Sequence, residues 1–455
     1  MPIAAARPLG RRHQPFKIWA SREQFFTELA LFTVGAAGSY SVNVIGQLPG
    51  NEIIILSLLP VMLVIHPRRA FRREYLWFYV LVFGWLFGTV AGDLYLGTTV
   101  ASSIKGFARV VFFAFDFMAL AIMIKDNTRR MIIFLLSIFV QMIYAMASFR
   151  GDFLTQWKFG GSSIATIIAL LISSHFYSRR RYGVCLAIVL GIAGLNLIFA
   201  FRSQIATDLV SAVLTLPIFA TRRRANDQPS RARRLFQITS LLVLAGSAAY
   251  LSNAVIKYAA DHGVFDESIQ QKFQTQSAGK LGVLVGGRPE TLVAIQAIRD
   301  SPIIGHGSFA VDPKYLQLKQ DIMYEYDYVD TDTADDSEGE PAIPTHSHLT
   351  QAWVESGLLG GIFWIYVLVL TFRGILQVVF ERPGLAPLYS YLLLNFVWNI
   401  LYSPFGSVNR MWATYFMLMS YHLLKVKAPK TLPSHSRRIR IPARLTTARL
   451  PRTAI

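Results

Sequence analysis

Two histidines and a carboxylate lie close together where a polar segment runs into an apolar one. His346 and His348 follow a stretch rich in acidic residues, and Glu355 lies nine residues after His346, within the apolar stretch. Ionisable side chains are energetically unfavourable at a membrane edge, so their presence there favours a functional site. A histidine whose pKa is near neutrality can accept a proton from a hydroxyl group. The spacing therefore predicts general-base chemistry at a membrane surface.

Two arginines elsewhere in the chain carry charge suited to the same chemistry. Arg202 lies in a short turn between two apolar stretches, and Arg288 lies in the polar segment that precedes His346. Guanidinium groups hold phosphate oxygens and neutralise negative charge that develops on them. The alternative for Arg202 is a structural ion pair with Asp208, six residues further along. Arginines together with a base, and with no evident metal site, predict transfer from a phosphate-activated donor to a hydroxyl acceptor.

The donor is expected to be lipid-linked, because the chain has no Gly-rich phosphate loop for a soluble nucleotide. Lys105 and Arg109 share one face of an apolar helix, at roughly 8 and 14 Å below its outer end. They either bind lipid phosphate or pair with acids on neighbouring helices. Glu355 is expected to orient a histidine or an arginine. His348 either assists His346 or only caps and packs.

Membrane helices must position these side chains. Hydrophobic residues make up 53% of the chain and charged residues 16%, unlike the composition of a soluble domain. Since a span needs roughly 17–25 residues, we expect an all-α integral membrane protein with about twelve transmembrane helices. The expected spans are residues 25–46, 52–66, 75–92, 100–124, 130–148, 162–178, 182–200, 203–220, 235–251, 350–372, 385–403 and 411–425.

Loop charge predicts how these spans are oriented. Lys and Arg concentrate in the N-terminal segment, in every second loop and in the C-terminal tail, as they do in cytoplasmic segments. Both termini are therefore expected in the cytoplasm, with one large extracytoplasmic loop domain between helices 9 and 10. The expected divisions are a cytoplasmic segment 1–24, helices 1–9 in 25–251, a periplasmic loop with short helices in 252–348, helices 10–12 in 349–425 and a basic cytoplasmic tail 426–455.

The net charge of +18 does not indicate nucleic-acid binding. The basic residues lie in short membrane-flanking loops and in the tail, where they orient helices and attract anionic membrane lipids. The single cysteine, Cys185, lies in an apolar span, so neither a disulfide framework nor a Cys-based metal site is expected. The acidic run at 321–340 lacks the ligand spacing of a calcium loop, and we expect it to be a solvated loop.

Two blocks of sequence resemble signatures of the O-antigen ligase and polymerase superfamily. The first runs from Gly287-Arg288 to Asp300-Ser301-Pro302-Ile303-Ile304-Gly305-His306-Gly307, and the second from His346-Ser347 to Gln351-Ala352-Trp353-Val354-Glu355-Ser356-Gly357. Phe201-Arg202-Ser203 resembles the arginine that follows the middle spans of the superfamily. The resemblance is strongest over residues 195–372. The superfamily commonly has His-Asn where this chain has His346-Ser347, and His348 is an additional histidine.

The resemblance implies glycosyl transfer that needs no metal ion and no cofactor. A glycan on undecaprenyl diphosphate is passed to a sugar hydroxyl with inversion of the anomeric carbon. The superfamily's arginines map onto Arg202 and Arg288, and its histidine maps onto His346. The implied active site faces the periplasm, at the inner membrane of a bacterium.

Three functions are compatible with this sequence. A polymerase uses a lipid-linked glycan as both donor and acceptor, and it is our first hypothesis. A ligase transfers the glycan to lipid A-core. A transporter or flippase of lipid-linked polysaccharide is the third, although no repeat of spans, as many transporters show, is evident. Charged residues gathered at the outer face favour an enzyme over a transporter.

Overall fold

The chain folds almost entirely into helices. The computed structural model describes residues 22–44, 46–148, 153–199, 201–215, 288–326 and 342–425, together with scattered positions between 239 and 263. Within these residues the one sheet is an antiparallel hairpin of β1 (Ser41–Asn43) and β2 (Gln47–Pro49). The expected helical fold class is confirmed.

Three helices in the described part of the chain are long and apolar enough to cross a membrane. They are α4 (Leu76–Leu96) with the preceding η1 (Arg73–Tyr75), α5 (Val100–Ile124) and α16 (His348–Glu381). The shorter apolar helices are α1 (Arg22–Ala37), α2 (Gly50–Ile65), α8 (Ser162–Ser178) and α9 (Tyr182–Ile198). The chain is therefore a helical membrane protein, and the count of twelve spans stays a prediction.

The remaining helices connect or flank these. They are α3 (Pro67–Ala70), α6 (Thr128–Ser148), α7 (Phe153–Gln156), the π-helical η2 (Trp157–Gly161), α10 (Arg202–Thr215), α14 (Glu290–Asp300), α15 (Pro313–Glu325), α17 (Ala386–Tyr402) and α18 (Ser407–Lys425). The expected span 235–251 lies largely outside the described residues, as does much of the acidic run 321–340.

The first expected span, residues 25–46, is wrong in its second half. α1 ends at Ala37, and the chain then turns into the β1–β2 hairpin. Ser39 Oγ donates to the carbonyl of Ala36 at 2.8 Å, and Gly50 N–H donates to the carbonyl of Tyr40 at 2.7 Å, which closes the hairpin. The 16 residues of α1 extend about 24 Å, which is shorter than the ~30 Å hydrocarbon core.

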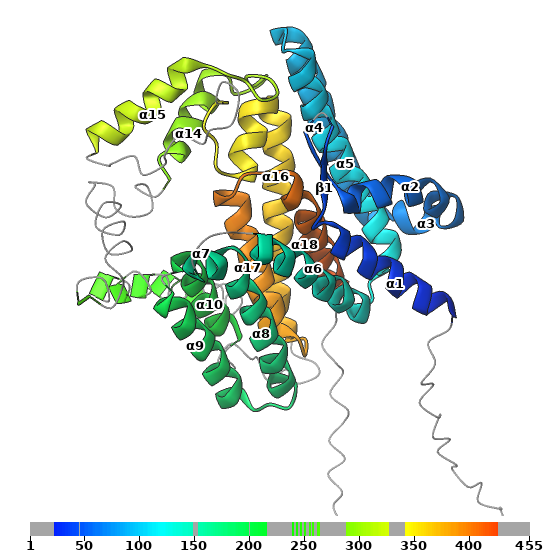
Figure 1. Ribbon diagram of the computed structural model, residues 1–455, viewed down its shortest axis with the longest axis vertical. Helices are drawn as coiled ribbons and strands as arrows, with labels where there is room; N and C mark the ends of the chain where they lie inside the picture. Colours follow the sequence, from blue (N-terminus) through cyan, green and yellow to red (C-terminus); the bar gives the residue numbers. More distant parts are fainter. Residues whose placement is uncertain are drawn as a thin grey trace, which may run out of the picture.

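The expected span 350–372 is too short at both ends. α16 begins at His348 and continues to Glu381. It lies at the centre of the molecule, packed against α4, α17 and α18 (Figure 1). Gly374 allows the added turns to approach the neighbouring helices, since a Cβ there would lie 3.2 Å from Leu393 Cδ1 and 3.4 Å from Ser420. Tertiary packing thus extends the helix beyond the stretch that hydropathy alone marks.

Aromatic side chains form the core shared by α4, α5 and α16. Trp85, Phe113, Phe363, Trp364 and Phe405 are all buried. The rings of Trp85 and Phe363 stack with centroids 5.1 Å apart, and those of Phe113 and Trp364 with centroids 6.1 Å apart. Aromatic pairs of this kind contribute about 0.5–1.5 kcal/mol beyond the area they bury. This core supports the half of α16 that follows its first two turns.

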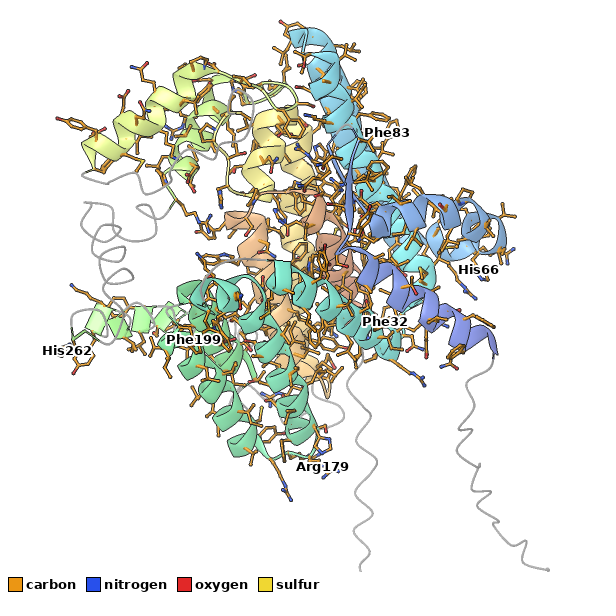
Figure 2. The ribbon with its side chains drawn as sticks, viewed as in Figure 1. Phe32, His66, Phe83, Arg179, Phe199 and His262 are labelled. Carbon is orange, nitrogen blue, oxygen red and sulfur yellow. The ribbon has the colours of Figure 1, made fainter. Side chains whose placement is uncertain are left out.

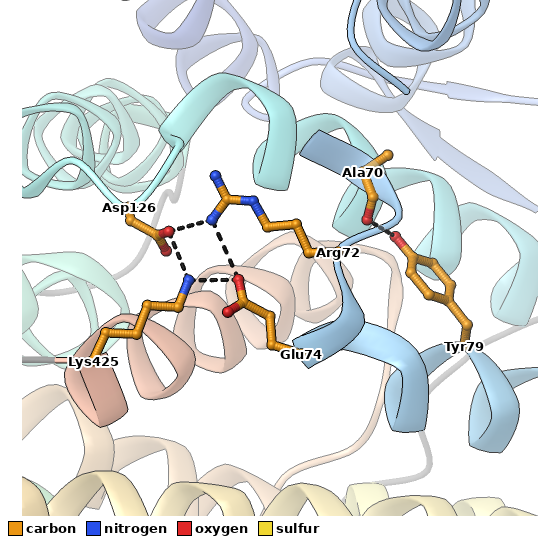
Figure 3. A network of polar contacts seen from close by, with 6 residues as sticks. All are labelled: Ala70, Arg72, Glu74, Tyr79, Asp126 and Lys425. Atoms are coloured by element: carbon orange, nitrogen blue, oxygen red, sulfur yellow. Dashed lines mark hydrogen bonds and ion pairs between the residues drawn. The ribbon is translucent and has the colours of Figure 1, made fainter. Parts of the chain in front are cut away.

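The two ends of the helix bundle carry different structures. At one end, α14 and α15 cover the start of α16 (Figure 1). At the other end, Asp126 accepts hydrogen bonds from Arg72 and Lys425, and Glu74 accepts from the same two cations (Figure 3). Burial opposes ionisation of Asp126, but the hydrogen bonds from Lys425 and Arg72 lower its pKa. The network joins three chain segments that loop charge assigns to one side of the membrane.

α16 is interrupted at Gly357, where φ is 62° and ψ is −151°. The interruption leaves backbone groups of the helix without partners inside it. The carbonyls of Val354 and Glu355 instead accept hydrogen bonds from the N–H groups of His306, at 2.7 Å, and Gly307, at 3.1 Å. Because a buried backbone group must be paired, the loop before α15 completes the helix.

The same loop also closes the far side of the interruption. Leu358 N–H donates to the carbonyl of Ile303 at 3.1 Å. Gly305 has a φ of 82°, and a Cβ there would come within 2.6 Å of Gly357 N. The close backbone approach therefore requires glycine at both positions. The two sequence blocks that carry the superfamily resemblance meet through these backbone contacts.

Replacing Gly357 with alanine is expected to destabilise the fold. The new Cβ would overlap the carbonyl of Ile303, and a φ of 62° is unfavourable for any residue with a side chain. We expect a loss of about 2–3 kcal/mol, measured by thermal unfolding of the detergent-purified protein. Gly194→Ala in α9 is the control, because no atom lies within 4 Å of its added Cβ. That control should be neutral or slightly stabilising; equal melting temperatures for G357A and the wild type would contradict the interpretation.

Candidate active site

A pocket of about 420 Å³ lies between the start of α16, α14 and α15. Its lining also includes the extended segment 342–346, Phe309 and Pro404. The charged or titratable side chains in this lining are those of Glu290, Lys319, His346 and Glu355. Two of the predicted site residues, His346 and Glu355, therefore line one cavity.

His346 is half-buried and lies in the extended segment just before α16. The next residue, Ser347, is the N-cap of the helix: its Oγ accepts a hydrogen bond from Thr350 N–H at 3.0 Å. The same hydroxyl donates to the carbonyl of Ile400 on α17 at 2.9 Å. Serine and asparagine are both favoured N-caps, which gives a physical reason why serine replaces the asparagine common in the superfamily.

Glu355 is held on two sides. Arg109 of α5 forms an ion pair with its Oε2, and Gln351 donates to its Oε1 at 3.3 Å. The oxygen of the Gln351 amide accepts from Phe405 N–H at 2.8 Å, which ties the loop between α17 and α18 to the same carboxylate. The side chain of Arg109 is 6% exposed and that of Glu355 is 13% exposed. Of the two alternatives for Arg109, the structure contains the ion pair with an acid on a neighbouring helix.

Phe309 adopts a positive φ of 51°, which is uncommon for a bulky residue. The preceding residue, Ser308, is fixed by two hydrogen bonds of 2.7 Å, from its N–H and its Oγ to the Asp93 carboxylate at the end of α4. The Phe309 ring then lies 4.2 Å from the guanidinium carbon of Arg109 and 5.9 Å from Lys105 Nζ. Cation–π contacts of this kind contribute about 0.5–2 kcal/mol. The unusual backbone conformation brings an aromatic ring to both predicted cations.

Lys105 keeps its charge available. Its side chain is exposed, and no described residue forms an ion pair with it. It lies one helical turn before Arg109 on α5, as the sequence predicts. Of the two predicted cations on this helix, Lys105 therefore remains the one suited to an added anion.

The sequence analysis missed Glu290 and Lys319, which form an ion pair at 3.3 Å in the pocket lining. Both side chains are largely buried, at 14% and 17% exposure. It also missed Gln351, although the four-residue spacing from Glu355 is a recognisable helical pairing. The sequence offered one indication that Glu290 belongs to the site: it directly follows Arg288-Pro289, at the start of α14.

A polar cluster fixes α14 and α15 above the pocket. Asp300 accepts hydrogen bonds from Lys314 Nζ at 2.6 Å and from the Tyr315 hydroxyl at 2.8 Å. These two hydrogen bonds lower the pKa of Asp300 to about 2, so the carboxylate stays ionised at neutral pH. His306 adjoins this cluster, since its Nε2 lies 3.5 Å from the Tyr315 hydroxyl and 2.8 Å from the carbonyl of Ala297 on α14. His306 is thereby a structural link between α14 and the loop that completes α16.

Arg288 lies immediately before α14, where its carbonyl accepts a hydrogen bond from Thr291 N–H at 3.0 Å. Arg288 is not itself in the lining of the pocket, but Glu290, two residues later in the sequence, is. Arg202 begins α10, and its side chain lies outside the described part of the chain. Asp208, its alternative partner, accepts a 2.8 Å hydrogen bond from Asn196 Nδ2. That Arg202, Arg288 and His346 face one cavity stays a prediction.

His348 occupies a different environment from His346. It is 1% exposed, and its Nδ1 lies 2.6 Å from the carbonyl of Ser403. Its ring packs edge-on against Trp364 and Phe405, at centroid distances of 4.9 and 5.1 Å. These contacts correspond to the packing alternative for His348 and not to substrate binding.

The pocket thus combines a group suited to proton transfer with the ion pair of Glu290 and Lys319. His346 has access to the cavity, and Glu355 is fixed by Arg109 at its edge. Within the described ranges, no group of three or more His, Cys, Asp or Glu side chains is arranged to hold a metal ion.

The Arg109–Glu355 pair is expected to show strong energetic coupling. Arg109→Met and Glu355→Gln each leave a largely buried partner without its counter-charge, and each should cost about 3–5 kcal/mol. The double variant should cost clearly less than the sum, as a thermal-unfolding double-mutant cycle would measure. The Lys314–Asp300 pair, which is 61% and 27% exposed, is the control and should couple by about 1 kcal/mol or less. Additive effects at Arg109 and Glu355 would rule out the coupling.

A comparison with known protein families finds a match that covers most of the predicted site residues. Residues 187–365 match the family model for O-antigen ligase, a range that includes Arg202, Arg288, His346 and Glu355. No curated protein and no solved structure matches the chain. Residues 187–365 are therefore similar to the O-antigen ligase family, and the predicted resemblance to the O-antigen ligase and polymerase superfamily is confirmed.

Proposed function

We propose that this protein is a membrane glycosyltransferase that passes a glycan from undecaprenyl diphosphate to a sugar hydroxyl. The observation that carries the proposal is the pocket at the start of α16, whose lining includes both His346 and the fixed Glu355 side chain. Both residues fall within the region that matches the O-antigen ligase family. The proposed location is the periplasmic face of a bacterial inner membrane, with both termini in the cytoplasm.

The proposed reaction is a single displacement. His346 accepts the proton of the acceptor hydroxyl as that oxygen forms a bond to the anomeric carbon of the donor. The bond from that carbon to the phosphate oxygen breaks, and undecaprenyl diphosphate leaves with the electron pair. Attack from the face opposite the leaving group inverts the anomeric carbon. The proton on His346 is then released to water.

The leaving diphosphate gains negative charge, which cations must neutralise. We assign this role to Arg288 and Arg202, whose planar guanidinium groups match phosphate oxygens. Lys105 extends the cationic surface because it is exposed and lies beside Phe309. Arg109 acts in a different way: its charge is balanced by Glu355, so it positions the pocket wall and contributes little net charge.

Polymerase and ligase share this chemistry and differ in the acceptor. We propose a polymerase of a cell-surface polysaccharide, in which a lipid-linked glycan is both donor and acceptor. The description of the matching family as O-antigen ligase favours a second candidate, in which lipid A-core is the acceptor. A transporter or flippase is less well supported, because the charged pocket lies at one end of the bundle.

Two substitutions test the assigned roles. His346→Ala removes the base and should lower product formation by about 10²–10⁴-fold. Arg288→Ala removes charge stabilisation of the leaving group and should lower it by about 10²–10³-fold. His175→Ala, at an exposed position on α8, is the control and should retain full activity. Protein levels in the membrane should be normal in all three variants, and full activity in H346A or R288A would refute the assignment.

The assay also separates the two acceptors. Purified protein is incubated with an undecaprenyl-diphosphate oligosaccharide, with and without lipid A-core, and products are separated by size. Chain growth without lipid A-core indicates a polymerase, and transfer that requires lipid A-core indicates a ligase. The absence of both products from a folded protein would contradict the proposed function.

A further inference from the structure

A second cavity, of about 590 Å³, opens on the side of the molecule between α4 and α5. Its walls are almost entirely apolar, with Val82 and Val110 buried at its floor and Leu76 and Phe83 exposed at its edge. Phe83 projects from α4 on the side away from α14 and α15 (Figure 2). We call this cavity the α4–α5 groove. None of its lining residues belongs to the candidate active site.

Arginines mark one end of the α4–α5 groove. Arg72 and Arg73 are part of its lining, and Arg68 and Arg69 lie just before them in α3. Arg72 is occupied by Asp126 and Glu74 (Figure 3). Arg73 is exposed, and no described residue forms an ion pair with it. The end of the groove therefore presents uncompensated positive charge.

The length of the groove matches one leaflet of a bilayer. From Leu76 to Leu86 its wall follows α4 for about 15 Å at the rise of an α-helix. This is half of the ~30 Å hydrocarbon core. The arginines lie at the end of the bundle that carries the Asp126–Lys425 network, whereas the candidate active site lies at the start of α16.

We propose that the α4–α5 groove binds an anionic phospholipid of the leaflet nearest to Arg73. One acyl chain lies between α4 and α5 against Val82 and Val110, and the negatively charged headgroup lies at Arg73. Two observations specify this occupant: an apolar slot one leaflet long requires a hydrocarbon chain, and the free guanidinium at its end requires an anion. The site is separate from the proposed glycosyl transfer and does not depend on it.

The test uses the purified full-length protein in detergent and native mass spectrometry. It is titrated with phosphatidylglycerol and with phosphatidylcholine that carry identical acyl chains. The wild type should bind phosphatidylglycerol more tightly, and Arg73→Gln should weaken that binding about fivefold while leaving phosphatidylcholine unchanged. Ala114→Trp fills the groove and should weaken binding of both lipids; Val111→Phe, also in the lining, is a second blocking variant should A114W fail to fold.

Matched controls separate this site from general lipid contact. Val80→Trp places the same side chain on α4 at an exposed position outside the groove, and Arg181→Gln removes an exposed arginine from another loop. Both should bind like the wild type. Equal binding of the two phospholipids by the wild type, or equal effects of A114W and V80W, would overturn the proposal. Undecaprenyl phosphate forms a third arm, and tighter binding of that lipid in a groove-dependent manner would also overturn it.

Discussion

The interruption of α16 at Gly357 is the constraint on which the site depends. A continuous helix would satisfy its own backbone, and the loop at residues 303–307 would have nothing to bind. Because the helix opens, the carbonyls of Val354 and Glu355 accept hydrogen bonds from that loop, and α14 and α15 are anchored against the start of α16. Ser356 in the opened turn also meets α4, since its Oγ lies 2.8 Å from Thr89 Oγ1 and accepts from Trp85 Nε1 at 3.2 Å. One backbone irregularity therefore aligns the outer segment, α4 and the residues around the pocket.

Buried charge is the second organising feature, and its arrangement is similar in two places. Arg109 of α5 pairs with Glu355 of α16, and Arg410 of α18 pairs with Glu52 of α2 through two hydrogen bonds of 2.6 and 2.8 Å. Removing either partner inside a membrane leaves a charge that neither lipid nor protein can solvate. Such pairs add little net stability compared with apolar residues, but they disfavour other helix registers. The pairs thus connect the first helices of the chain to the last ones.

The sequence predicts the helical class and most helix positions because long apolar runs and loop charge are local properties. Hydropathy placed α5 at its observed bounds, since the apolar run from residue 100 to residue 124 is long enough to tolerate Lys105 and Arg109 within it. It misplaced the end of α1, where a short hairpin follows Ala37, and the end of α16, where packing around Gly374 adds further turns. The sequence selected His346 and Glu355 as site residues, and the structure places both in the lining of one cavity. Lys319 and Phe309 could not be found in this way, because their places depend on how α15 and the 308–309 turn fold onto other elements.

The start of α16 determines which histidine faces the cavity. Successive residues of an extended segment point to opposite sides, so Ser347, which bonds to Ile400 of α17, leaves His346 directed toward the pocket. His348 is the first helical residue, and its ring turns into the aromatic core and bonds to Ser403. Two residues of the same type are thus separated by the capping hydroxyl between them. If the helix began one residue earlier or later, the bond from position 347 to α17 would be lost and His346 would leave the cavity. The cap at Ser347 therefore fixes which of the two histidines can act as the proposed base.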